Sequence, residues 1–209
     1  ETADYVLNEA GFGADLGAEK YFDIVMPASG LKPSAAVIVA TVRALAAQGA
    51  GDLGRGLANL GRHIDIVRGF GVPAVVAVNH FPDDRAEDFA LVSAYCRERG
   101  VGCAASEVFA RGGEGGLDLA AQVMAAVASA TADPRPAYEA EWPLERKIET
   151  IARRVYGAEG VDFSDAARAS LARFTELGWG SLPVCMAKTP LSFSHDPKLL
   201  GAPAGGGCP

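Results

Sequence analysis

The sequence predicts an α/β fold built on a parallel sheet, and two patterns carry that prediction. Short, continuous apolar runs rich in Val and Ala recur along the chain, which is typical of strands covered on both faces. Apolar residues at helical spacing fill the segments between these runs. Strand and helix in alternation indicate a doubly wound sheet, in which ligands bind beyond the carboxyl ends of the strands.

The expected strands cover residues 35–41, 72–78 and 101–108. Between the first two, Leu60, Ile64 and Val67 recur at helical spacing. Similar patterns predict the full set of helices over residues 57–70, 85–99, 117–131, 144–156 and 164–177.

The chain divides into three expected parts. Residues 1–132 form the α/β core, residues 133–143 a proline-rich connector, and residues 144–209 a smaller, mainly helical segment with an irregular, truncated end. In this last part Ser164 is the expected N-cap of the final helix, and Gly157 and Gly178 follow the ends of the two helices.

Composition excludes several classes of function. A net charge of −7 without any cluster of lysine or arginine argues against nucleic acid or an anionic membrane surface as partner. The apolar runs are far shorter than the roughly 20 residues that cross a bilayer. The cysteines and histidines show no zinc-binding spacing, so no metal-ligating residue is expected, and the unpatterned cysteines favour the cytoplasm.

A glycine-rich segment near the start of the chain is the first candidate site. Gly11, Gly13 and Gly17 give the spacing G-x-G-x-x-x-G, which misses the dinucleotide fingerprint by one residue. Such a segment can form an anion-binding nest of backbone N–H groups, or simply a tight loop between a strand and a helix.

Two aromatic residues at neighbouring strand ends form the second candidate site. Phe81 follows Asn79, and Phe109 stands where the next strand is expected to end. If the two strands are neighbours, both rings lie at one edge of the sheet, where they could hold a planar heterocycle. A plain turn at residues 79–82 is the alternative.

Two more segments could contact an anionic ligand. Residues 111–116 hold four glycines in the string RGGEGG, which indicates either close approach of the backbone to a ligand or a flexible loop. Lys188 could meet a phosphate or a carboxylate, but a surface lysine whose stem covers apolar groups is the commoner case. The chain contains no G-x-x-x-x-G-K-[ST], G-x-S-x-G or H-E-x-x-H motif.

Several strings, in order along the chain, resemble the formate–tetrahydrofolate ligase family. They are ETADYVLNEAGFGADLGAEKYFDI, GLKPSAAVIVATVRAL, NLGRHIDIVRGFGVPAVVAVNHFP, SEVFARGGEGGLDLA and LPVCMAKTPLSFSHDPKLLGAP. Family members are longer, and this sequence resembles an internal piece from their second half. Residues 43–57 are shorter than the matching family segment, and the pattern stops after LLGAP.

The resemblance implies a P-loop-NTPase-like core that here lacks the P-loop itself. It also implies ATP-dependent ligation of formate to tetrahydrofolate, through formyl phosphate, to give 10-formyltetrahydrofolate. ATP with Mg²⁺, formate and tetrahydrofolate are the expected small-molecule ligands, and a homotetramer in the cytoplasm is the expected assembly. Because the P-loop is missing from these residues, we expect the chain alone to be inactive.

Residue roles are also implied by the resemblance. Phe81 and Phe109 match the family's pterin-stacking aromatics, the second of which is usually Trp. A Phe there offers less area, so folate binding should be weaker than usual.

The resemblance also implies which residues contact the formyl phosphate intermediate and which contact the nucleotide. Gly13, Gly17 and Lys20 match the family segment that faces the formyl phosphate, and they are the expected catalytic residues. The expected nucleotide-binding residues are Asn79, Gly112, Gly113 and Lys188.

Two other classes of function stay open. One is a non-catalytic folate- or nucleotide-binding module, or an assembly subunit, on the same scaffold. The other, more distant, is an oxidoreductase that binds NAD at residues 11–17.

Overall fold

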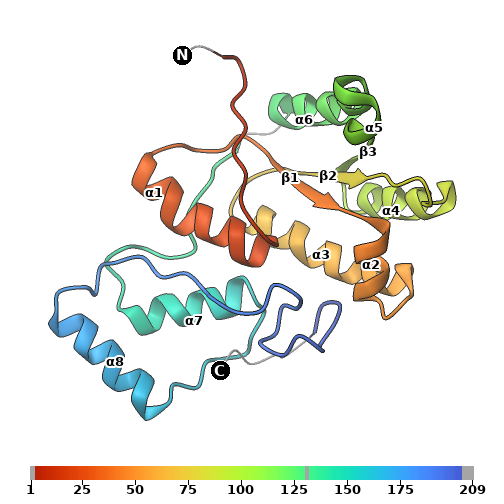
Figure 1. The fold of residues 1–209 in the computed structure, drawn as a ribbon. Coiled ribbons are helices and arrows are strands. Elements are labelled where there is room, and N and C mark those ends of the chain that lie inside the picture. The colour runs from red at the N-terminus through yellow and green to blue at the C-terminus, as the bar shows by residue number, and fades with distance from the viewer. Residues whose placement is uncertain (1–2, 130–131, 204–209) are drawn as a thin grey trace.

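A computed structural model describes residues 3–129 and 132–203 (Figure 1). A three-stranded parallel sheet lies at its centre, with the strands β1 (Ala36–Ala40), β2 (Ala74–Asn79) and β3 (Gly102–Ser106) in that order. The predicted α/β class and the three predicted strands are confirmed. β3 ends two residues earlier than expected, because the chain turns at Glu107 into the short helix α5 (Val108–Arg111).

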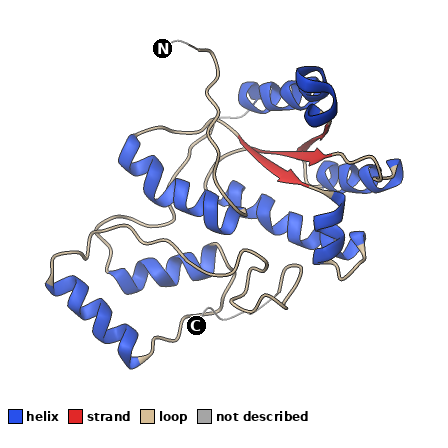
Figure 2. Ribbon diagram, viewed as in Figure 1, coloured by secondary structure: helices blue, strands red, loops and turns tan. Residues whose placement is uncertain are grey.

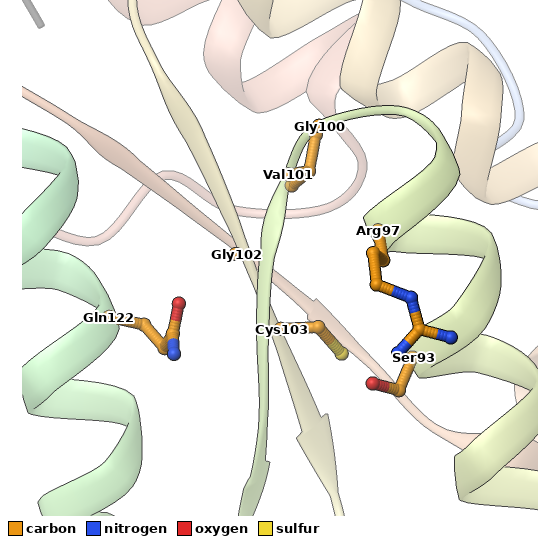
Figure 3. A pocket seen from close by; sticks show the side chains of 7 residues that line it. All are labelled: Ser93, Arg97, Gly100, Val101, Gly102, Cys103 and Gln122. Carbon is orange, nitrogen blue, oxygen red and sulfur yellow. The ribbon is translucent and has the colours of Figure 1, made fainter.

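Helices cover the sheet on both sides (Figure 2). On one side, α3 (Leu53–Gly69) packs against β1, β2 and α4 (Ala86–Glu98). On the other side, α6 (Leu117–Ser129) packs against β2 and β3, so that α4 and α6 flank β3 from opposite faces (Figure 3). This two-sided cover explains why β2 is apolar throughout and almost fully buried.

The outer strand β1 is less well covered. Val37 and Val39 point to the same face and are 37% and 63% exposed. Their register partners in β2, Val75 and Ala77, are buried. This exposure leaves one face of β1 open. Because β1 is the outermost strand in the part of the chain that the structure describes, its outer edge is also unpaired.

A tight helical pair fills the segment that is expected to be shorter than its family counterpart. Thr41 caps α2 (Val42–Gln48), and Asp52 caps α3, which therefore starts four residues before its expected position. Gly56 of α3 lies against the backbone of α2, since a Cβ there would meet the Leu45 carbonyl oxygen at 1.7 Å. The connection is thus a compact turn without room for side chains at the contact.

The glycine-rich start of the chain is helical from residue 14 onward. Two π-helical turns, η1 (Ala14–Ala18) and η2 (Tyr21–Val25), continue into α1 (Met26–Ser29), which ends at Gly30 with φ of 71°. We call residues 14–29 together the first helix. The alternative of a tight loop is wrong for residues 14–20, which lie within this helix.

The C-terminal part forms a layer beneath α3 (Figure 1). It comprises α7 (Leu144–Arg154), α8 (Asp165–Glu176) and an irregular segment, and Ser164 caps α8 as expected. Buried residues from this layer, such as Ile151, Tyr156 and Phe193, join the same hydrophobic core as the sheet. The division into three parts stays a prediction, and residues 204–209 of the predicted tail lie outside the described residues.

Candidate functional site

The carboxyl ends of β2 and β3 bring several polar side chains together. Asn79 is paired in register with Ser106, and the His80 N–H donates to the Ser106 carbonyl at 3.0 Å. The Glu107 carboxylate lies 3.7 Å from His80 Nδ1 through one oxygen and accepts a hydrogen bond from Arg111 at 2.8 Å through the other. We call these five residues the strand-end cluster. They stand where ligands bind in parallel α/β sheets.

Both predicted aromatic residues border this cluster. β2 and β3 are neighbours, so Phe81 and Phe109 do follow adjacent strands at one edge of the sheet. Phe81 is 40% exposed, and the Arg43 guanidinium lies 5.4 Å from its ring centroid. Phe109 lies on α5 and is fully exposed. Phe109 therefore offers a free aromatic surface, whereas Arg43 lies over one face of Phe81.

The glycines after α5 differ in what surrounds them. These residues form the short helix η3 (Gly112–Gly116). Gly115 packs against Glu107, since an added Cβ would lie 2.5 Å from its carbonyl carbon, and its own carbonyl accepts the Glu107 N–H at 3.0 Å. Gly112 and Gly113 have no atom within 4 Å of an added Cβ. Close packing therefore explains Gly115, whereas Gly112 and Gly113 border open space.

A second group of candidate residues surrounds a buried ion pair that includes Lys188. The Lys188 ammonium donates to Asp15 Oδ2 at 2.9 Å, and both side chains are almost fully buried. Its other donors contact the carbonyls of Thr189 and Ser192, and it lies 5.1 Å from the Tyr156 ring centroid. The interpretation of Lys188 as a surface lysine is wrong. All three of its N–H groups are used, so contact with a nucleotide would require the ion pair to open.

The expected catalytic glycines pack beside this ion pair. A Cβ on Gly13 would lie 2.6 Å from both Asp15 Oδ1 and His63 Cε1, and one on Gly17 would lie 1.8 Å from the Gly11 carbonyl oxygen. These glycines are therefore required by close packing. Lys20, by contrast, is exposed.

Backbone donors near Gly13 are already in use. The Ala14 N–H donates to His63 Nδ1 at 3.2 Å, and the N–H groups of Leu16 and Gly17 donate to the Gly13 carbonyl. The pKa of His63 is lowered by burial, in keeping with a neutral ring that accepts this hydrogen bond. These three N–H groups are consequently not free to form an anion-binding nest.

Asp15 belongs to a buried row of acids that sequence reasoning missed. Asp15, Glu19 and Asp23 recur every four residues on one face of the first helix, and all three are buried. Burial and the nearby Asp23 carboxylate raise the pKa of Glu19 to about 9. Burial also raises the pKa of Asp23 to about 6, although the Ala137 N–H donates to it at 2.5 Å. Burial and the neighbouring carboxylate therefore favour the protonated form of Glu19 at neutral pH.

The predicted site residues therefore fall into two groups. Asn79, Phe81, Phe109, Gly112 and Gly113 gather at the carboxyl ends of β2 and β3. Of the remaining candidates, Gly13, Gly17 and Lys188 surround the buried Asp15, and Lys20 is exposed. His80, Glu107 and Arg111 were not predicted, although they stand within the strings NHFP and SEVFAR that drew attention to the strand ends.

The described residues show neither a membrane-spanning helix nor a cluster of metal ligands. No helix within residues 3–129 and 132–203 has the length and apolar character needed to cross a membrane. Over the same residues, no group of three or more His, Cys, Asp or Glu side chains is arranged to hold a metal ion.

A comparison with known protein families shows to which family the chain belongs. The family model for formate–tetrahydrofolate ligase matches residues 1–207 of the 209-residue chain. The chain belongs to the formate–tetrahydrofolate ligase family. This confirms the resemblance found in the sequence. The family is that of a ligase of one-carbon metabolism whose substrates are formate and tetrahydrofolate.

Proposed function

We propose that these residues supply the folate platform of a formate–tetrahydrofolate ligase and do not activate formate by themselves. The observation that carries the proposal is the pair of exposed rings, Phe81 and Phe109, at the ends of neighbouring parallel strands. A pterin ring is planar and aromatic, so stacking on either ring suits this position. The family match supports tetrahydrofolate as the ligand.

The proposed reaction has two steps. Formate first takes the terminal phosphoryl group of ATP, which gives formyl phosphate and ADP. The N10 nitrogen of tetrahydrofolate then attacks the formyl carbon, phosphate leaves, and the nitrogen loses its proton to give 10-formyltetrahydrofolate. The second step needs the pterin to be held beside an anionic leaving group, and preorganised donors stabilise the charge that develops there.

Residues of the strand-end cluster suit that second step. Arg111, held by Glu107 beside the open Gly112 and Gly113, supplies a fixed positive charge near the stacking rings. Asn79 ends β2 at the same edge and can donate and accept hydrogen bonds. We propose that Asn79, Gly112 and Gly113 border the nucleotide, and that Gly13, Gly17 and Lys20 contribute to catalysis chiefly through the shape of the first helix.

Activation of formate needs more than these side chains. The 209 residues contain no G-x-x-x-x-G-K-[ST] motif, whose backbone and lysine cradle nucleotide phosphates. The described residues offer no cluster that would hold Mg²⁺ on its own, so a magnesium ion would depend on nucleotide phosphates for most of its ligands. The open edge of β1, with Val37 and Val39 exposed, offers a place where a P-loop-bearing segment could extend the sheet.

A non-catalytic folate-binding module is the second candidate. The missing phosphate motif favours it, because binding by aromatic stacking needs no nucleotide. Binding of a folate polyglutamate without turnover, in the presence of a P-loop-bearing family segment, would support this candidate over the ligase. A homo-oligomer and a cytoplasmic location remain predictions from the family resemblance.

Variants at position 109 test the folate platform. Phe109→Ala should weaken binding of a folate polyglutamate about 2- to 12-fold, which corresponds to the 0.5–1.5 kcal/mol of one aromatic pair. Phe109→Trp should tighten binding, because indole offers more area. The readout is the Kd from fluorescence titration.

A matched control is Phe174→Ala, which removes a partly exposed Phe from α8. It should leave folate affinity unchanged. Nucleotide binding, measured in parallel, should change little in either Phe109 variant. Equal loss of folate and nucleotide binding in Phe109→Ala would count against stacking.

A further inference from the structure

Two cysteines that the proposed reaction does not use lie side by side between α4 and β3. Cys96 lies on α4 and belongs to the hydrophobic core, and Cys103 lies on β3 and packs against that core. The chain reverses between them at Gly100, with φ of 63°, and the Val101 N–H donates to the Cys96 carbonyl at 2.9 Å. This turn is what brings the two thiols together.

The two sulfurs interact directly. The pKa of Cys96 is lowered because the Cys103 thiol donates a hydrogen bond to its thiolate, and the positive charge of Arg99 acts in the same direction. The pKa of Cys103 is raised by the same hydrogen bond and by burial. The same hydrogen bond places the two sulfurs in direct contact where α4 packs against β3.

A cavity gives access to one of the two sulfurs. It has a volume of about 280 Å³ and is lined by residues of α4, β3 and α6, among them Ser93, Arg97, Cys103 and Gln122. Figure 3 shows the Cys103 sulfur pointing toward α4, on the side where Ser93 and Arg97 stand. Cys96 is fully buried, whereas Cys103 is partly exposed. A small molecule can thus reach Cys103 first, and the Arg97 guanidinium favours one that carries carboxylates.

We propose that Cys96 and Cys103 form a dithiol site that low-molecular-weight anionic disulfides oxidise to an internal disulfide. The Cys103 thiol loses its proton to solvent and attacks the small disulfide, which forms a mixed disulfide on Cys103 and releases one small thiol. The Cys96 thiolate then attacks the Cys103 sulfur, which releases the second small thiol. The two protein thiols lose two electrons and two protons, and the two released thiols gain them.

The sequence makes this product easy to identify. Arg97 and Arg99 stand between the two cysteines, so trypsin places Cys96 and Cys103 on separate peptides, residues 86–97 and 100–111. The folded chain is incubated with oxidised glutathione, and the remaining thiols are alkylated before digestion and mass spectrometry. The expected product is the two peptides joined by a disulfide, with the loss of two hydrogen masses, and dithiothreitol should restore both thiols.

Two comparisons decide the outcome. Cys185 is exposed, so it should take a glutathione adduct and keep it. In Cys96→Ala, Cys103 should likewise keep an adduct that it loses in the unmodified chain. A stable glutathione adduct on Cys103 in the unmodified chain, or alkylation of both Cys96 and Cys103 after oxidation, would overturn the proposal.

Discussion

Replacement of Glu19 by Gln should abolish a large pH dependence of stability. The Glu19 side chain is completely buried, and neither of its carboxyl oxygens has a hydrogen-bond partner of good geometry. Its pKa is raised to about 9 in the folded chain, against 4.5 for an ordinary Glu. Glu19→Gln keeps the size and the neutral character of the protonated acid while removing its ionisation.

The size of this pH dependence follows from the difference in proton binding between the folded and the unfolded chain. Between pH 4.5 and 9 the folded chain keeps the Glu19 proton and the unfolded chain has lost it, so stability falls as pH rises. The slope is about 1.4 kcal/mol per pH unit, which gives a loss of about 2.7 kcal/mol from pH 6 to pH 8. Asp23, whose pKa is about 6 in the folded chain against 3.8 for an ordinary Asp, adds a further loss of stability. That loss is nearly complete by pH 6.

Urea unfolding followed by circular dichroism at pH 6, 7 and 8 measures this effect. The unmodified chain should lose stability relative to Glu19→Gln across the series, while groups common to both proteins cancel in the difference. Glu149→Gln, which removes an exposed carboxylate from α7, serves as control and should track the unmodified chain. A difference between the unmodified chain and Glu19→Gln that stays constant from pH 6 to pH 8 would show that Glu19 is ionised in the folded protein.

Two further predictions concern the packing around Asp15. Lys188→Met should lower the free energy of unfolding by about 3–5 kcal/mol in urea titrations, because Asp15 is left buried without its partner. The double variant with Asp15→Asn should recover part of that loss, and a fully additive double variant would contradict the ion pair. Gly17→Ala should cost more than about 1 kcal/mol, since its Cβ would meet the Gly11 carbonyl oxygen at 1.8 Å. Gly11→Ala, with open space around its Cβ, should stay within about 0.5 kcal/mol of the unmodified chain, and equal melting temperatures for the two alanine variants would refute the packing argument.

Periodicity alone located the sheet and most of its helices. The run of valines in β2 is buried on both faces, and Leu60, Ile64 and Val67 do face the core from α3. The first helix was not predicted, because Gly13 and Gly17 lower helix propensity and favour a loop on local grounds. Contact with the Gly11 backbone requires glycine within that helix, so tertiary packing overrides the local preference.

The sequence predicted the part of the candidate site that follows from the order of the strands. It did not predict the part that depends on an ion pair between residues far apart in the chain. Phe81 and Phe109 could be placed at one edge because parallel neighbours end together. The burial of Lys188 could not be predicted, since its partner Asp15 lies near the other end of the chain. The spacing of Asp15, Glu19 and Asp23, every four residues, was the available signal for a buried polar face.

The most direct test of the account measures folate binding and turnover in the same sample. The chain is supplied with ATP, Mg²⁺, labelled formate and a tetrahydrofolate polyglutamate, and labelled 10-formyltetrahydrofolate is quantified beside the folate Kd. We predict saturable folate binding, weakened by Phe109→Ala, with no labelled product from these 209 residues alone. ATP-dependent formation of 10-formyltetrahydrofolate by this chain alone, or the absence of folate binding, would contradict the account.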